Sequence, residues 1–144
     1  MTDSYNKCSQ EQYFAQLIER INQSDGYTKI SHITLTHVSL GCAEGELKTV
    51  PDVLNPLGMV HGGCLAALAD TVTGAAAHSI GQLCVTLNCS MNYLKPAKGG
   101  TIFCRARVQK SGRTIQVCEA VLTDDRGETV ATGTFTFYAI KRAE

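Results

Sequence analysis

The sequence predicts an α+β fold in which one long helix packs against an antiparallel sheet. Two different hydrophobic periods carry this prediction. Residues 63–81 repeat apolar side chains at the 3.6-residue spacing of a helix, whereas residues 85–93 alternate apolar and polar side chains as a half-buried strand does. Three more alternating segments follow, joined by short turns that contain glycine, which is typical of antiparallel hairpins.

The predicted central helix has an unusual distribution of small residues. Asp70 lies off its apolar face, and the residues three and four positions away from Asp70 are all small. We therefore expect this helix to be covered on all sides, with a neighbour approaching closely on the Asp70 side. Gly81 ends the helix. His78, in the last turn, is expected to be a surface residue whose cationic form suits the negative end of the helix dipole.

Paired glycines, Gly62 and Gly63, open this helix. The first N–H groups of a helix have no intrahelical partner and suit an anion or a developing oxyanion, although paired glycines alone can also simply allow a tight entry from the loop. Asp70 lies seven residues beyond Gly63, about 10 Å along the axis, too far to act on a carbonyl held at that same terminus. If both groups act on one bond, they come from two chains, which predicts a site shared across the two-fold interface of a homodimer.

The segments before the central helix predict a helix and two strands. Ser9 and Gln12 can form a capping box ahead of apolar residues at helical spacing, in a helix ending near Asn22. Strands are expected at residues 32–40 and 45–50, with an irregularity in the first and a turn at 41–44. After the strand at 85–93, further strands are expected at residues 101–109, 115–123 and 129–140.

Length, charge and cysteine content limit the possible classes of protein. A chain of 144 residues fits one domain, 1–144, of which residues 1–26 form an N-terminal helical extension. Its 13 basic and 13 acidic residues balance, so no overall field would attract nucleic acid or an acidic membrane surface, and no apolar run is long enough to span a bilayer. Seven cysteines without a signal-peptide pattern favour a cytoplasmic location. No CxxC pair or close set of histidines is present, so no metal site is predicted.

Residues 55–63, NPLGMVHGG, followed by Asp70, resemble the motif of the hotdog-fold acyl-CoA thioesterases of the phenylacetate-degradation (PaaI-type) family. Residues 92–97 and 110–114 resemble that family's later strand and hairpin. The resemblance implies a hotdog fold, in which a curved antiparallel sheet wraps a long helix, and dimers that often form a homotetramer. It also implies hydrolysis of a thioester at the dimer interface, with coenzyme A as part of the substrate and no separate cofactor.

The same resemblance implies catalytic roles for five residues. Asp70 would act as general base on water or as nucleophile, and the N–H of Gly62 would polarise the thioester carbonyl. Asn55 and His61 would position the thioester or the water. Thr86, which lies on the polar face of its strand, would help to hold the water. From the residues alone, Asn55 can equally be a turn former, and His61 can simply bind its loop.

Substrate-binding residues are expected around these five. Gly63 would lie beside the polarising N–H, and the apolar side chains of Leu57 and Met59 are expected to line the acyl pocket. The resemblance implies that basic residues near the 110–113 turn contact the phosphates of coenzyme A, although the composition of this turn also suits a solvated hairpin tip. The candidates there are Lys110 and Arg113, with Lys95 and Lys98 behind them.

Other interpretations remain open at this stage. Cys64, just inside the helix, is an alternative nucleophile, because a helix N-terminus can lower a thiol pKa, but it also suits the role of a small apolar helix residue. A non-catalytic acyl-CoA binding hotdog protein is an alternative to an enzyme. A hotdog hydratase or dehydratase is another, and it would need a histidine and a carboxylate placed to move protons at adjacent carbons.

Overall fold

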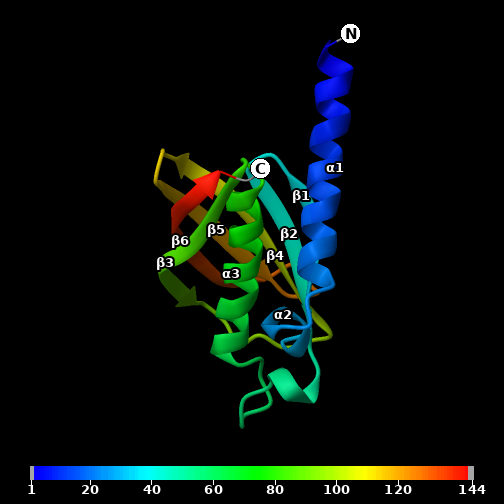
Figure 1. The fold of residues 1–144 in the computed structure, drawn as a ribbon. Helices are drawn as coiled ribbons and strands as arrows, with labels where there is room; N and C mark the ends of the chain where they lie inside the picture. Colours follow the sequence, from blue (N-terminus) through cyan, green and yellow to red (C-terminus); the bar gives the residue numbers. More distant parts are fainter. Residues whose placement is uncertain (1, 143–144) are drawn as a thin grey trace.

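The computed structural model describes the backbone of residues 2–142 and the side chains of residues 9–140. Figure 1 shows a curved sheet wrapped around one long helix, with a second long helix beside the sheet, so the predicted α+β arrangement is confirmed. In chain order the elements are α1 (Thr2–Asn22), α2 (Tyr27–Ile30), β1 (Ile33–Ser39), β2 (Cys42–Lys48), η1 (Pro51–Val53), α3 (Gly62–His78), β3 (Gln82–Tyr93), β4 (Thr101–Ser111), β5 (Ile115–Thr123) and β6 (Thr129–Arg142).

All six strands form one antiparallel sheet with the order β1-β2-β4-β5-β6-β3. The irregularity expected in the first strand is confirmed, because the register shifts between Leu35 and His37. The prediction of a turn at residues 41–44 is wrong. The observed turn is shorter and β2 begins at Cys42, because Gly41 adopts a φ of 72° and closes the hairpin tightly. The sequence signals also missed the short helices α2 and η1.

Helix α3 lies against the concave face of the sheet, where the core is formed. Leu68, Ala69 and Val72 are 0% exposed. β2 comes so close that a Cβ added at Gly45 would lie 2.7 Å from Val72 Cγ2, so glycine is needed there. The Asp70 side of α3 is only partly covered within the single chain, which leaves room for a ligand or a partner on that side.

The two edges of the sheet differ in how they are covered. Helix α1 packs along β1, where Leu17 is buried. The side-chain amide of Asn22 donates to the carbonyl of Leu35 and accepts from its N–H, both at 2.8 Å, as a neighbouring strand would. The other edge, β3, is exposed along most of its 12 residues. No helix in the described part of the chain is both long and apolar enough to cross a membrane.

Candidate active site

The N-terminus of α3 is capped by His61. Its Nδ1 accepts a hydrogen bond of 2.8 Å from the N–H of Gly63, so the neutral ring carries its proton on Nε2. A Cβ added at Gly63 would lie 2.9 Å from that Nδ1, which explains the glycine at this position. His61 is exposed, so it caps the helix and still presents an N–H donor.

Gly62 provides a second donor at the same helix terminus. Within the described residues, no acceptor lies within hydrogen-bond distance of its N–H, whereas its carbonyl accepts from the hydroxyl of Tyr93 at 3.0 Å. The ring of Tyr93 packs over Gly62 and so fixes the end of β3 to the start of α3. This free N–H at the positive end of a helix can stabilise an oxyanion. Tyr93 was not a predicted site residue, because strand alternation gives no sign of a contact with the helix.

Asn55 organises the loop before α3. Its Oδ1 accepts from the N–H groups of Leu57, at 2.9 Å, and Met59, at 3.1 Å. The backbone N–H of Asn55 donates to the carbonyl of Met59, which closes the loop. Asn55 is therefore a turn former, and its amide Nδ2 has no acceptor among the described residues. Its role toward a substrate remains a prediction.

Asp70 lies on α3, two turns beyond this terminus, and faces β3. The hydroxyl of Thr86 donates a 2.7 Å hydrogen bond to its Oδ1. Because that bond uses one carboxylate oxygen, the other remains available to accept a proton from water. The structure thus brings together two residues that the sequence had placed on different elements, a helix and the polar face of a strand.

A cavity of about 370 Å³ opens beside Asp70 and Thr86, between α3 and β3. His78 also lines it, so the prediction of a cationic surface residue is wrong. Its Nδ1 lies 2.7 Å from the carbonyl of Gly74, and burial lowers the pKa of its imidazole. The sequence could not indicate this, because the cover over His78 comes from other elements: Tyr13 on α1 donates to its carbonyl, and Cys84 on β3 lies 3.8 Å from its ring.

Cys64 and the buried cysteines of the sheet are poor candidates for a nucleophile. Burial raises the pKa of Cys64, which disfavours the thiolate that a nucleophile needs. Burial also raises the pKa of Cys84 to about 11 and that of Cys118 to about 12. The six described cysteines are all free thiols.

The other predicted binding residues lie away from Asp70 within one chain. Leu57 is 79% exposed at the tip of the loop, and Met59 is partly buried. Lys110 and Arg113 lie at the hairpin between β4 and β5, at the opposite end of the molecule from that loop (Figure 1). Lys95 forms an ion pair of 2.8 Å with Glu128. A nucleotide site at the hairpin therefore remains a prediction.

Comparison with known proteins agrees with this geometry. The model of the thioesterase superfamily matches residues 57–131, just over half of the chain, from the loop before α3 into β6. The chain belongs to the thioesterase superfamily. This match covers Gly62, Asp70 and Thr86.

Three similar proteins within reach of comparison are an enzyme and two solved structures. It is 28% identical over 110 residues to acyl-coenzyme A thioesterase PaaI of Escherichia coli, covering 76% of this chain and 79% of that protein. A conserved protein of Pseudomonas aeruginosa superposes with a TM-score of 0.79 at 31% identity, covering 84% of this chain and 98% of that one. A Streptococcus mutans protein bound to acetyl CoA superposes with a TM-score of 0.78 at 29% identity, covering 85% and 100%.

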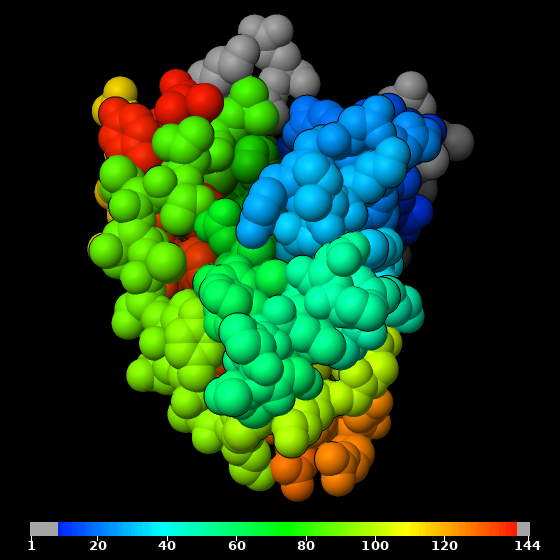
Figure 2. Space-filling model, turned by 90° about the horizontal axis from the view of Figure 1, so that it is seen from below, coloured from blue at the N-terminus to red at the C-terminus, as the bar shows by residue number. Residues whose placement is uncertain are grey.

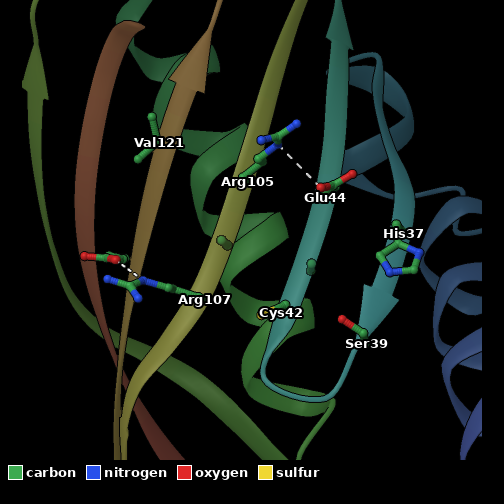
Figure 3. Close-up of a pocket in the computed structure, with 10 residues that line it drawn as sticks. His37, Ser39, Cys42, Glu44, Arg105, Arg107 and Val121 are labelled. Atoms are coloured by element: carbon green, nitrogen blue, oxygen red, sulfur yellow. Dashed lines mark hydrogen bonds and ion pairs between the residues drawn. The ribbon is translucent and has the colours of Figure 1, made fainter.

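In this thioesterase superfamily member a second hollow, also of about 370 Å³, lies on the sheet face turned away from α3. Figure 3 shows that Arg105 points from β4 toward Glu44 on β2, at 3.4 Å, while Arg107 of the same strand pairs with Glu119 on β5. These two pairs diverge and leave the hollow between them. They are surface pairs, which contribute little to stability on their own.

Proposed function

We propose that this protein is an acyl-CoA thioesterase, which hydrolyses a thioester to a free acid and coenzyme A. The observation that carries the proposal is the carboxylate of Asp70, held by Thr86 at the wall of a cavity, in a chain whose α3 begins with an unpaired N–H. The relatives support the substrate class, since one is named an acyl-coenzyme A thioesterase and another was solved with acetyl CoA bound.

The proposed chemistry assigns one task to each group. Asp70 accepts a proton from water through the oxygen that Thr86 does not occupy, and the water oxygen forms a bond to the thioester carbon. Negative charge develops on the carbonyl oxygen and is stabilised by the N–H of Gly62, with the Nε2–H of His61 as a positioning donor. The C–S bond then breaks, and the thiolate of coenzyme A leaves and takes up a proton.

A nucleophilic Asp70 is the alternative to a general base. In that route Asp70 attacks the thioester carbon to form an anhydride, coenzyme A leaves as its thiolate, and water then hydrolyses the anhydride at the Asp70 carbon. A single turnover in ¹⁸O-labelled water detects this route, because attack at that carbon places the label in the carboxylate of Asp70, whereas a general base places it in the product acid alone. Label found in that carboxylate would support the nucleophile.

The catalytic groups meet only if two chains combine. Gly62 and Asp70 are eight residues apart on α3, about 12 Å along its axis, so one thioester carbonyl cannot reach both in a single chain. The first half of β3 carries Thr86 beside Asp70, and its end carries Tyr93 beside Gly62. In antiparallel pairing about a two-fold axis, the first half of one β3 lies against the second half of the other. Such pairing brings Asp70 of one chain toward Gly62 of its partner.

The exposed edge of the sheet supports this dimer. β3 has 12 residues and is an edge strand with no pairing strand on its free side in the described chain, and its Val85, Leu87 and Tyr93 are 49%, 57% and 52% exposed. Proteins rarely leave such an apolar edge open. Because the other edge is closed by α1 and Asn22, β3 is where a second sheet can join.

The same two-fold axis explains how the basic hairpin can reach the site. Antiparallel pairing places the β4–β5 hairpin of one chain at the end where the partner's α3 begins. Lys110 and Arg113 are both exposed there and can bind the phosphates of coenzyme A, whose thioester lies at the interface. The nucleotide and the carboxylate would then come from neighbouring chains.

We further propose that two such dimers form a tetramer through the outer face of the sheet. Three large apolar side chains of the sheet, Phe103, Val121 and Tyr138, are each 40–42% exposed, and Figure 3 shows Val121 on the same face as the Arg and Glu pairs. A face that alternates apolar groups with both signs of charge can match a copy of itself. Sedimentation velocity would test this, with four chains expected; an active species of two chains would exclude a need for the tetramer. The free thiols suit a reducing cytoplasm, which we propose as the location.

The decisive experiment is release of free thiol from a panel of acyl-CoA esters by wild type and Asp70→Asn. Turnover in wild type should fall by about 10²–10⁴-fold in the variant, as expected for loss of a general base. Glu11→Gln, at an exposed position of α1, is the matched control and should leave turnover unchanged. Blanks without substrate are needed, because Cys42 and Cys89 are exposed and react with thiol reagents.

Each other result of this experiment has a clear meaning. Acyl-CoA that binds without any turnover would favour a non-catalytic binding protein. Loss of the conjugated absorbance of an enoyl-CoA without thiol release would favour a hydratase.

A further inference from the structure

A series of hydrogen bonds runs from the end of β3 to the start of α3. The hydroxyl of Tyr93 donates to the carbonyl of Gly62 at 3.0 Å. That carbonyl belongs to the peptide bond between Gly62 and Gly63, and the N–H of the same peptide donates to Nδ1 of His61 at 2.8 Å. The neutral ring of His61 then has an N–H of its own, on Nε2, for a further acceptor. Each group in the series therefore donates toward the next, from Tyr93 to His61.

The series lies at the surface, at the end of the molecule where α3 begins. In Figure 2, which views this end, residues 50–60 in blue-green lie beside the end of β3 in yellow-green. His61 and Tyr93 are both exposed, Tyr93 at 52%. A substrate can therefore reach Nε2 of His61.

The backbone of this terminus is held without the hydroxyl of Tyr93. The N–H of His61 donates to the carbonyl of Val53 at 2.8 Å, and the carbonyl of His61 accepts from the N–H of Cys64 at 2.9 Å. These bonds fix the peptide that carries the N–H of Gly62, so this donor does not depend on Tyr93. The hydroxyl can influence only the next peptide and, through it, the ring of His61.

The ring and the hydroxyl of Tyr93 have separable tasks. The ring lies 3.5 Å from the position of a Cβ built at Gly62, so its packing alone joins β3 to α3. The hydroxyl adds a hydrogen bond that polarises the Gly62 carbonyl, and a polarised carbonyl makes the N–H of the same peptide a better donor. Burial raises the pKa of Tyr93, so the hydroxyl keeps its proton at neutral pH. The donor that begins the series is therefore present where the protein works.

We infer that Tyr93 is a positioning residue, which acts on the reaction through His61. Its hydroxyl fixes the peptide between Gly62 and Gly63, whose N–H holds Nδ1 of His61 as an acceptor and so directs the Nε2 proton at the substrate. The inference rests on the proposed thioesterase function, in which that proton binds the thioester oxygen or the water. Without the hydroxyl the ring of His61 is less firmly held, and its donor is misaligned in the transition state.

Tyr93→Phe is the direct test, since it keeps the ring and removes only the hydroxyl. We expect kcat for an acyl-CoA ester to fall by about three- to tenfold, the size of one net hydrogen bond, while KM changes by less than about twofold. Tyr27→Phe, which removes a hydroxyl from a tyrosine of α2 that is 65% exposed, is the matched control and should leave both constants unchanged. Equal kcat in Tyr93→Phe and wild type, or a change in KM alone, would overturn the inference.

A double-mutant cycle shows whether the effect passes through His61. His61→Asn keeps an oxygen that can accept from Gly63 and so keeps the helix cap, but it has no atom at the place of Nε2. It should lower kcat, and adding Tyr93→Phe to it should lower kcat no further. If Tyr93→Phe reduced kcat by the same factor in both backgrounds, Tyr93 would act by another route and the inference would be overturned. Urea unfolding and sedimentation velocity check that each variant keeps its fold and assembly.

A second measurement needs no substrate. In protein labelled with ¹⁵N-histidine, the ¹⁵N shift of Nδ1 of His61 reports the hydrogen bond that this nitrogen accepts, and His61→Asn identifies the signal. The shift should move in Tyr93→Phe and stay unchanged in Tyr27→Phe; an unmoved shift in Tyr93→Phe would overturn the inference. If the shift moves but wild type hydrolyses no acyl-CoA, the thioesterase proposal fails while the series of hydrogen bonds stands.

Discussion

The hydroxyl of Thr86 is 2.7 Å from Oδ1 of Asp70 and donates a hydrogen bond to it. This bond fixes the orientation of the carboxylate, because the side chain would otherwise rotate about the bond that joins it to the helix. A general base works only if one of its lone pairs points at the water. Loss of the hydrogen bond from Thr86 should therefore change the rate of the reaction. Within the described residues the side chain of Thr86 forms no other hydrogen bond.

Replacing Thr86 should therefore lower kcat more than it lowers stability. We expect Thr86→Val to reduce kcat by about tenfold to a hundredfold, because misorientation of a catalytic group has effects of this size. Thr86→Ser keeps the hydroxyl and should stay within a few-fold of wild type. Steady-state kinetics with unfolding in urea as a control would measure both; equal kcat in Val and Ser variants would show that the bond has no catalytic role.

The open β3 edge leads to a prediction about assembly. A lysine at Leu87, which is 57% exposed, would place a charge in the proposed strand pairing. Leu87→Lys should yield monomers by sedimentation velocity, and these monomers should be inactive, because each site needs two chains. Leu40→Lys is the matched control, since Leu40 is similarly exposed, at 60%, in the β1–β2 turn near the closed edge. Full activity in a monomeric Leu87→Lys protein would contradict the shared site.

The closed edge depends on Asn22. Its amide satisfies both backbone groups of Leu35, and truncation would leave a partly buried N–H and C=O without partners. Asn22→Ala should lower the free energy of unfolding by about 1–3 kcal/mol, seen as a lower urea midpoint at an unchanged slope. Gln23→Ala, at a neighbouring exposed position, should change it little. Equal stability of the two variants would mean that water replaces the amide at this edge.

The periodic parts of the fold could be predicted from the sequence. The small and apolar residues around Asp70 identified α3, and alternation identified β3 with Thr86 on its polar face. These signals are local, since each depends on side chains within a few residues of one another. The hydrogen bond from Thr86 to Asp70 could be expected only once the resemblance to known thioesterases linked the two elements.

The contacts that could not be predicted are those between elements far apart in the chain. Asn22 ends a helix and gives no sign that it will pair with Leu35, because the pairing joins two elements 13 residues apart in the chain. His78 has the spacing of a surface residue, and only the packing of α1 and β3 over the end of α3 makes it a neutral, half-buried group. Similarly, the two-residue turn at Gly41 follows from a left-handed backbone conformation, which the composition of residues 41–44 does not specify.

The buried state of His78 leads to a prediction about pH. Burial lowers its folded-state pKa below the ordinary value of 6.5, and the nearby charge of Arg20 acts in the same direction. Between these two pKa values the unfolded chain binds the proton and the folded chain does not, so stability falls as pH falls through 6.5 and is fully present above it. His78→Asn cannot titrate and should lose less stability than wild type between pH 7.5 and 5.5, measured as the urea midpoint.

A substitution without a titratable group is the control for this experiment. Gln23→Ala, at an exposed position, should lose as much stability as wild type on acidification. If His78→Asn and wild type lost equal stability on acidification, His78 would have the same pKa in the folded and unfolded chains.

The hairpin between β4 and β5 can be tested through substrate binding alone. Arg113 is exposed at this hairpin, and we expect it to affect the reaction by holding the nucleotide of a substrate bound at the interface. Arg113→Ala should raise KM for acyl-CoA by about tenfold and change kcat by less than about twofold, because a lost ion pair with a phosphate weakens ground state and transition state equally. Arg126→Ala, at the exposed turn between β5 and β6, should leave both constants unchanged. A short thioester of pantetheine lacks the nucleotide, so Arg113→Ala and wild type should hydrolyse it with the same kcat/KM. A difference between them would mean that Arg113 acts on the reacting end of the substrate. The proposed direction of coenzyme A across the dimer would then be wrong.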